Sequence, residues 1–273
     1  MLNREDIRIR DPFVYIENGV YYLLGTTGDD CWGYGSDLTL YISKDLESFE
    51  PVGKMVDDYY LEGYSNIWAP ELHRYNGKYY LILSLYREDI GRGSIIFVSD
   101  FLMEKFVPLT GEYITPKEWG CLDASLLVWK NKPYLFFSYE WTTPEGDGSI
   151  YVAELSCDLK QIAREPKRIV NGKDCGISKE IENGGYRGYV AEGPYAVEEN
   201  GKIVLYWSTF TETGYSVAKN MADDIFGHYQ FEEVVFAKDG GHCMVFTDLQ
   251  GKPKLTLHQP NVSPNERMKL FAL

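Results

Sequence analysis

A hairpin pattern that recurs five times along the chain limits it to few folds. Each repeat has a short apolar strand, a polar turn and a second strand rich in Tyr, Leu, Ile and Phe. Apolar residues alternate with a period of two around each turn, which favours strands over helices. The turns fall 50 to 70 residues apart, at Gly19, Gly77, Asn131, Gly201 and Gly251. A repeat of this length that contains only strands predicts propeller blades of about four strands each.

The segments between the hairpins fit the remaining strands of each blade. Each starts with alternating apolar residues, passes through a charged bend and ends in a second short strand; they span 38–56, 94–114, 149–170 and 215–237. Only residues 265–273 follow the fifth hairpin, so the fifth blade lacks a strand, for which residues 5–10 are a candidate. No linker or shift in composition interrupts the chain. The sequence therefore predicts one all-β domain over residues 1–273, a five-bladed β-propeller.

Charge and composition exclude several classes of partner. The formal net charge of -14 argues against nucleic acid and anionic membranes. The first residues contain no apolar signal segment, and no apolar run approaches the length of a membrane span. The five cysteines are scattered without metal-binding spacing, as is typical of reduced thiols. We therefore expect a cytoplasmic protein without a zinc site, and the oligomeric state stays open.

An ionisable residue stands six to nine positions before each turn. These residues are Asp11, Glu71, Asp123, Glu192 and His242. The first strand of each propeller blade lines the central axis, so five residues at the mouths of these strands would converge on one pocket. The competing interpretation is that each caps a local turn, as Asp and Glu often do. The common offset in all five repeats favours convergence.

Converging carboxylates suit the hydrolysis of glycosidic bonds. Mutual repulsion keeps at least one of them protonated, so that one group can act as an acid and another as a base. Glycosidases need this pair, because an acid protonates the leaving oxygen while a base activates water. The 22 Tyr and 6 Trp would supply walls on which sugar rings stack, although Tyr is also a good strand former.

Four ordered motifs resemble those of the family 43 glycoside hydrolases. They are Arg10-Asp11-Pro12-Phe13, Trp68-Ala69-Pro70-Glu71, Leu122-Asp123-Ala124-Ser125 and Glu192-Gly193-Pro194-Tyr195. The resemblance covers nearly the whole chain and implies a five-bladed β-propeller that cleaves arabinose- or xylose-containing glycans with inversion. Inversion predicts acid and base carboxyls roughly 6.5–9.5 Å apart.

The resemblance also implies a role for each matched residue. Asp11 matches the general base, Asp123 the carboxylate that tunes and orients the acid, and Glu192 the general acid. His242 matches an axial histidine beside which many members hold calcium, although calcium prefers oxygen ligands and a hydrogen-bonded histidine is the alternative. Trp68, Glu71 and Tyr195 are expected to contact substrate, with coverage of the core as the alternative for Trp68.

These observations together predict an inverting glycosidase that releases a terminal pentose from short oligosaccharides, with α-L-arabinofuranose as the favoured sugar. β-Xylosidase or endo-arabinanase activity on the same scaffold is the nearest alternative. A fructan-cleaving relative is disfavoured, because the Trp-Met-Asn-Asp-Pro signature is absent. A non-catalytic sugar-binding propeller is disfavoured because all three carboxylates are present in their motifs.

Overall fold

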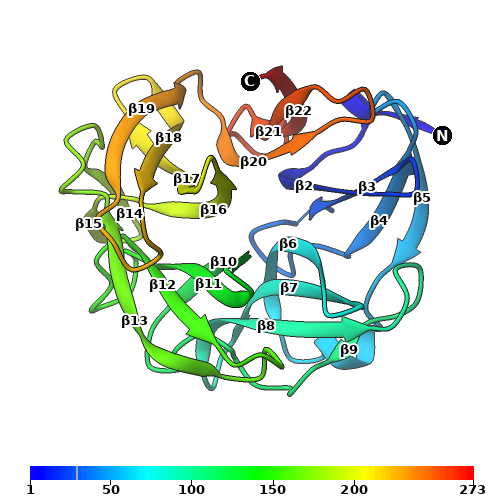
Figure 1. Cartoon of the computed structure of the whole chain (residues 1–273), viewed down its shortest axis with the longest axis horizontal. Helices are drawn as coiled ribbons and strands as arrows, with labels where there is room; N and C mark the ends of the chain where they lie inside the picture. The colour runs from blue at the N-terminus through cyan, green and yellow to red at the C-terminus, as the bar shows by residue number, and fades with distance from the viewer. Residues whose placement is uncertain (29) are drawn as a thin grey trace. The chain divides into compact units, whose positions relative to one another are not determined.

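The computed structural model describes residues 1–28 and 30–273, and its regular structure is almost entirely antiparallel sheet (Figure 1). The described residues form six sheets, of which five each contain one of the five predicted hairpins and the sixth is a separate two-stranded hairpin. The two helices in the described residues are short 3₁₀ turns, η1 (Arg4–Asp6) and η2 (Asp58–Leu61). None of the described helices is long and apolar enough to cross a membrane. The predicted fold class, an all-β five-bladed propeller, is confirmed.

The chain divides into two compact units. The first comprises residues 1–90, 95–112 and 243–273, and the second comprises residues 91–94 and 113–242. Blades one, two and five belong to the first unit, apart from the first residues of β8 and β20, and blades three and four belong to the second. The prediction of a single domain over 1–273 stays a prediction.

The first unit contains three sheets. Blade one has the strand order β1-β5-β4-β3-β2, with β1 (Leu2–Asn3), β2 (Arg10–Glu17), β3 (Val20–Thr26), β4 (Thr39–Ser43) and β5 (Ser48–Lys54). Blade two runs β6 (Ser65–Tyr75), β7 (Lys78–Arg87), β8 (Gly91–Ser99) and β9 (Val107–Pro108). Blade five has three strands, β20 (Gly241–Thr247), β21 (Pro253–Gln259) and β22 (Arg267–Ala272).

The N-terminal segment pairs with blade five over less than the length of a full strand. Arg8 forms an isolated antiparallel bridge with Arg267 of β22, and Ile9 N donates to Glu266 O over 3.3 Å. The regular strand in this region is instead β1, which pairs with β5 of blade one. Residues 5–10 therefore meet the last strand, as expected, without forming a full fourth strand.

The second unit contains two four-stranded sheets and one additional hairpin. Blade three runs β10 (Cys121–Trp129), β11 (Lys132–Tyr139), β12 (Ser149–Leu155) and β13 (Ile162–Asn171). Blade four runs β16 (Glu192–Glu199), β17 (Lys202–Thr211), β18 (Gly214–Ala222) and β19 (Gln230–Phe236). Between them lies the hairpin β14 (Ile181–Asn183) and β15 (Tyr186–Gly188), which the sequence pattern did not predict.

Tight turns set the register of the hairpins. Both central residues of the first turn have positive φ, 51° at Asn18 and 75° at Gly19, and Asn200 and Gly201 repeat this at 53° and 76°. Such turns match the right-handed twist of the flanking strands and favour Asn-Gly. The turn thereby fixes the register of each inner strand against the next strand, and this register determines the position of the residues at the start of the inner strand.

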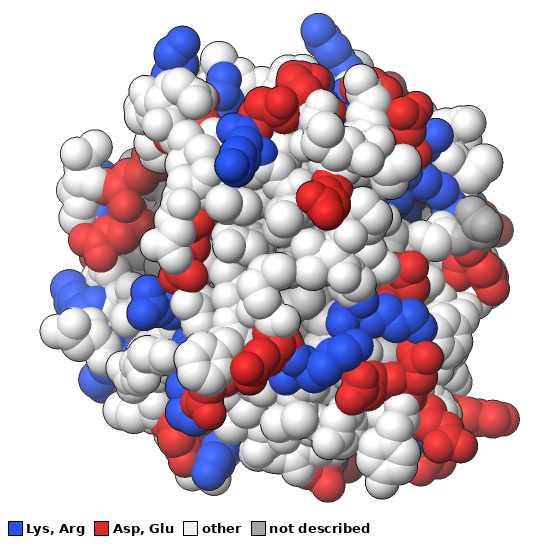
Figure 2. All heavy atoms as spheres, turned by 90° about the vertical axis from the view of Figure 1, so that its right-hand side faces the viewer, with Lys and Arg blue, Asp and Glu red and all other residues white. Residues whose placement is uncertain are grey.

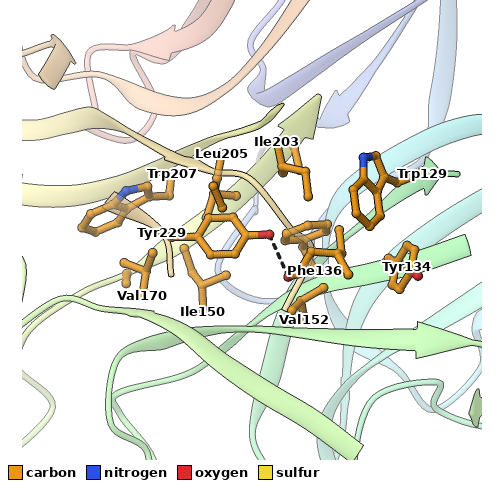
Figure 3. Packing of buried hydrophobic residues seen from close by; sticks show 14 of the residues in the cluster. Trp129, Tyr134, Phe136, Ile150, Val152, Val170, Ile203, Leu205, Trp207 and Tyr229 are labelled. Atoms are coloured by element: carbon orange, nitrogen blue, oxygen red, sulfur yellow. Dashed lines mark hydrogen bonds between the residues drawn. The ribbon is translucent and has the colours of Figure 1, made fainter. Parts of the chain in front are cut away.

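The core of the second unit is formed where blades three and four bring apolar strand faces together (Figure 3). Phe136, Ile203, Leu205 and Trp207 are almost completely buried in this cluster. The polar atoms of two of its rings are paired: Trp207 Nε1 donates to Asn220 Oδ1 over 2.8 Å, and Tyr229 OH donates to Ile225 O over 3.0 Å. The cluster supports β16, whose first residue is Glu192.

The surface carries both signs of charge despite the acidic composition. On the face in Figure 2, Lys and Arg side chains lie beside Asp and Glu side chains. Exposed groups of opposite charge form ion pairs in the described residues, such as Lys78 with Asp100 at 2.5 Å. Exposed pairs of this kind add little to stability, about 0–1 kcal/mol each.

Candidate active site

A left-handed backbone occurs near the start of each blade's inner strand. The residues are Asp11 (φ 51°), Ala69 (46°), Asp123 (57°), Gly193 (57°) and His242 (49°), and β6 has a second one at Asn66 (47°). The pairing register shifts at this point in β2, β6, β10 and β16, so the strand contains a bulge there. For a residue other than glycine this backbone costs of order 1–3 kcal/mol, and such strain often accompanies function. Bulges also redirect side chains next to active sites.

The bulge explains why the five predicted residues stand at different offsets from their turns. Asp11, Asp123 and His242 occupy the left-handed position itself, Glu192 precedes that position in its strand by one residue, and Glu71 follows it by two. Asp11, Asp123 and His242 therefore occupy equivalent positions in their strands. The side chains of Glu192 and Glu71 project from different positions.

In the first unit, Asp11 is held by the neighbouring strands. Thr26 Oγ1 accepts a hydrogen bond from Ala69 N at 2.9 Å, so its only proton is donated to Asp11 Oδ2 at 2.6 Å. Asp11 N donates to Nδ1 of the fully buried His258 at 3.2 Å, and the same nitrogen lies 3.4 Å from Asp11 Oδ1. The carboxylate is therefore held at Oδ2 by a donated hydrogen bond, and the His258 ring lies beside Oδ1.

Two tryptophans form an aromatic pair in the same unit. The rings of Trp32 and Trp68 meet edge to face, with centroids 5.6 Å apart, and Trp68 Nε1 donates to Cys31 O. The guanidinium of Arg10 lies 4.8 Å from the centroid of the Trp32 ring. Trp32 nevertheless remains 57% exposed. Because Arg10 directly precedes Asp11 on β2, this exposed ring is tied to the strand that carries the predicted base.

Glu71 is buried and paired. Its Oε2 lies 2.8 Å from His73 Nε2, and the His73 ring contacts Phe13 at 5.3 Å between centroids. Glu71 and His73 are two positions apart on β6, and Asp11 and Phe13 are two positions apart on β2. The expected substrate contact of Glu71 stays a prediction.

In the second unit, Asp123, Glu192 and His242 come together. Asp123, which is 7% exposed, accepts a hydrogen bond from Gly193 N at its Oδ2 over 3.0 Å. The same oxygen lies 3.8 Å from His242 Nδ1, and His242 N donates to Ser208 Oγ over 2.8 Å. A Cβ at Gly193 would lie 3.0 Å from His242 Cγ, and the residue has a positive φ, so glycine is required there.

Glu192 is oriented by a buried tyrosine. Tyr215 OH donates to Glu192 Oε1 over 2.8 Å, and Tyr215 is almost fully buried. A Cβ at Gly241 would lie 2.2 Å from Tyr215 Cε1, so the glycine leaves room for this ring. One carboxyl oxygen of Glu192 thus accepts from Tyr215, and its neighbour Gly193 ties the strand to Asp123.

Tyr195 lies three residues after Glu192 on β16, opposite Tyr206 of β17. It is half-buried, so part of its side chain reaches solvent. Its expected role in substrate binding stays a prediction.

The side chains around His242 do not match a calcium ion held directly. Calcium takes six to eight oxygen ligands, whereas the carboxylate beside His242 is Asp123, whose Oδ2 already accepts from Gly193. Among the described residues, no group of three or more His, Cys, Asp or Glu side chains is arranged to hold a metal. Calcium near His242 stays a prediction, and no chemical step is derived through it.

The predicted site residues fall into two groups, one in each unit. Asp11, Trp68 and Glu71 lie in the first unit, and Asp123, Glu192, Tyr195 and His242 lie in the second. Convergence on one pocket and the spacing of Asp11 from Glu192 therefore stay predictions. Sequence reasoning missed Thr26, Trp32, Tyr215 and His258. His258 had a signal in the scarcity of histidine, since the chain contains only 4, and Trp32 had one in its Gly- and Asp-rich loop.

Comparison with known proteins is consistent with this arrangement. The family model described as "Glycosyl hydrolases family 43" matches residues 6–268. A solved structure described as an endo-arabinase from Bacteroides thetaiotaomicron is 30% identical, with a TM-score of 0.90 over 100% of this chain and 96% of that chain. An α-L-arabinofuranosidase from Lactobacillus brevis shares the fold, with a TM-score of 0.75 over 97% of this chain and 90% of that chain at 19% identity.

A curated relative is similar over part of its length. It is an extracellular exo-α-(1→5)-L-arabinofuranosidase from Streptomyces chartreusis, 28% identical over 164 residues, which cover 58% of this chain and 48% of the relative. The match therefore spans about half of that protein. The cytoplasmic location expected from the sequence stays a prediction.

Proposed function

Because the chain belongs to family 43 of the glycosyl hydrolases and is thus a glycoside hydrolase, we propose that it releases terminal α-L-arabinofuranose from short oligosaccharides with inversion. The family includes enzymes for arabinose- and xylose-containing sugars, so the choice of arabinose is the finer part of the proposal. Support for it comes from the names of the Streptomyces relative and the Bacteroides structure, both of which refer to arabinose polymers or their fragments.

In the proposed reaction, Asp11 acts as the base and Glu192 as the acid. Asp11 removes a proton from water as the water attacks the anomeric carbon, and Glu192 protonates the departing glycosidic oxygen. Asp123 stays ionised and holds the strand of Glu192 through Gly193 N. Its charge opposes ionisation of Glu192, which keeps the acid protonated at neutral pH.

The observation that supports this proposal is the hydrogen bond between Asp123 and the residue that follows Glu192. The two carboxylates come from different blades, yet Asp123 accepts from the amide directly after Glu192, at 3.0 Å. A sugar-binding protein without catalysis would not need a buried carboxylate bonded to the backbone directly after a second acidic residue.

A second candidate is endo-acting arabinanase, which the 30% identical Bacteroides endo-arabinase structure favours. The two activities differ in product from the same linear arabino-oligosaccharide. An exo-acting enzyme releases arabinose from the first turnover, whereas an endo-acting enzyme releases shorter oligosaccharides first.

The test combines a panel of nitrophenyl glycosides with linear α-1,5-arabino-oligosaccharides. We expect cleavage of the α-L-arabinofuranoside and early release of arabinose from the oligosaccharide. Cleavage of the β-D-xyloside alone would replace the proposal with xylosidase activity, and early oligosaccharide products would replace it with endo-arabinanase activity. Absence of turnover on every substrate would contradict the proposed specificity.

Asp123→Asn tests the tuning of the acid. The amide oxygen can still accept from Gly193 N, but the negative charge beside Glu192 is lost, so the pKa of Glu192 should fall. We expect the alkaline limb of the kcat/KM profile to move to lower pH by about one unit, together with a lower maximal rate. An unchanged alkaline limb would contradict the tuning role of Asp123.

Trp32→Ala tests the exposed aromatic ring. A sugar ring stacked on Trp32 would lose its platform, so we expect KM to rise about tenfold, or about 1.4 kcal/mol, with little change in kcat. Trp32→Phe, which keeps a ring, should recover most of the affinity. Tyr59→Ala removes an exposed ring from η2 and serves as the control. Equal KM values for Trp32→Ala and Tyr59→Ala would exclude Trp32 from the substrate site.

A further inference from the structure

We propose that His258 and Asn261 are positioning residues for Asp11, and that a chain of buried polar groups fixes His258 as a neutral imidazole with its proton on Nε2. This inference rests on the proposed role of Asp11 as the base. It concerns the first unit alone, where β2, β21 and the loop before β22 meet.

The chain of contacts starts at a buried carboxylate. Glu266 has no exposed side-chain surface, and its Oε1 accepts from Arg10 over 2.8 Å. Its second oxygen lies 3.6 Å from Arg8 Nε. A buried charge of this kind is stable only when paired, so Glu266 anchors Arg10 in one orientation.

Arg10 in turn fixes the orientation of Asn261. Its second terminal nitrogen lies 2.9 Å from Asn261 Oδ1. Because a guanidinium can only donate, the atom of Asn261 that faces it must be the oxygen. The side-chain amide of Asn261 therefore cannot be flipped.

The orientation of Asn261 determines the tautomer of His258. His258 Nε2 lies 3.1 Å from the same Asn261 oxygen, which only accepts, so Nε2 must carry the proton. The other nitrogen, Nδ1, accepts from Asp11 N at 3.2 Å and so presents a lone pair. Both contacts are satisfied by the neutral ring with its proton on Nε2, and the imidazolium would break the contact at Nδ1.

This tautomer has two consequences for Asp11. First, the accepted N–H bond holds the backbone of Asp11, which has a left-handed φ of 51°, and thereby fixes where its side chain leaves the strand. Second, a lone pair 3.4 Å from Asp11 Oδ1 cannot donate to it. The carboxylate is then a stronger base than it would be beside an imidazolium, which would donate to it and compete with the proton from water.

The charged groups in this series of contacts together keep His258 neutral. Arg10 lies on the other side of Asn261 and opposes a second positive charge, whereas Asp11 favours one, and Glu266 with Arg8 forms an ion pair behind Arg10. The neutral amide of Asn261 separates His258 from Glu266. Replacing that amide by a carboxylate should therefore change the protonation of His258 with little change in shape.

Asn261→Asp and Asn261→Leu test the inference on whichever glycoside the wild type cleaves. In Asn261→Asp the new carboxylate still accepts from Arg10 and His258 but stabilises the imidazolium, which then donates to Asp11. We expect near-normal kcat at high pH and an acid limb of kcat/KM moved to higher pH. Asn261→Leu removes the acceptor, and we expect kcat about 10- to 100-fold lower at all pH values with KM little changed.

Asn265→Asp is the matched control, because it adds the same charge to the same loop at an exposed position. Melting temperatures establish that each variant is folded, and ¹⁵N NMR of the histidine rings in the wild type reports the tautomer of His258 directly. The inference is supported if His258 carries its proton on Nε2 and if the acid limb shifts in Asn261→Asp but not in Asn265→Asp. An Nδ1–H form, or Asn261→Asp and Asn265→Asp profiles that both match the wild type, would overturn it.

Asp11→Asn separates this inference from the proposed function. If Asp11→Asn stays active, the assignment of the base is wrong and the inference falls with it. If Asp11→Asn is inactive while both Asn261 variants behave as the wild type, the base assignment stands and only the positioning role is lost.

Discussion

Asp11→Asn is expected to lower kcat on every glycoside that the enzyme cleaves, by about 100- to 10,000-fold. The amide keeps the shape of the carboxylate and can still accept from Thr26 Oγ1, so the local structure should persist. What is lost is the capacity to remove a proton from the attacking water. Every substrate needs the same activated water, so the loss should not depend on the leaving group.

The measurement is steady-state kinetics on an arabino-oligosaccharide and on an activated aryl arabinofuranoside. Asp100→Asn, which removes an exposed carboxylate paired with Lys78, is the control and should match the wild type. Wild-type activity in Asp11→Asn would contradict the mechanism. A loss confined to the oligosaccharide would move Asp11 from the role of base to that of acid.

Glu192→Gln should show the opposite dependence on substrate. Its amide cannot protonate the departing oxygen, so hydrolysis of the oligosaccharide should fall by about 100- to 10,000-fold. The leaving group of an activated aryl glycoside departs with little help from an acid, so hydrolysis of this substrate should fall much less. Equal losses on both substrates would remove Glu192 from the role of acid.

Tyr215→Phe is the matched variant for Glu192→Gln. It removes the hydroxyl that donates to Glu192 Oε1 but leaves the carboxylic acid in place. A smaller loss than in Glu192→Gln, with the same preference for aryl substrates, would place Tyr215 in support of the acid.

The hairpins could be predicted from the sequence because their signal is local. Asn-Gly pairs between alternating apolar runs require two consecutive residues with positive φ, and the structure has them at Asn18–Gly19 and Asn200–Gly201. The outer strands were found for the same reason. The hairpin β14–β15 was missed because its strands have three residues each, too few for a period to be recognised.

The candidate site could be predicted only in part. Asp11, Asp123 and His242 share one backbone position, which a common offset from the turn approximates. The left-handed position itself leaves little trace in the sequence, because only Gly193 among Asp11, Ala69, Asp123, Gly193 and His242 is a glycine. The offset from the turn therefore grouped Glu71 with Asp11, Asp123, Glu192 and His242. In the structure, Glu71 lies two residues beyond the left-handed position and pairs with His73.

Contacts between distant segments could not be predicted at all. His258 is 247 positions from Asp11, and its role follows from a hydrogen bond that only the folded chain creates. The same holds for Tyr215 and Glu192, which are 23 positions apart on different strands. Such contacts depend on register and packing, for which a single sequence carries no direct signal.

The stereochemistry of the first product tests the central claim most directly. Proton NMR during the first minutes of hydrolysis of an α-L-arabinofuranoside distinguishes the two anomers of the released arabinose before they interconvert. Direct attack by water activated at Asp11 predicts that the β-anomer appears first and the α-anomer only later. Initial release of the α-anomer would contradict the account, because retention requires a covalent intermediate and leaves no role for a base that acts on the attacking water.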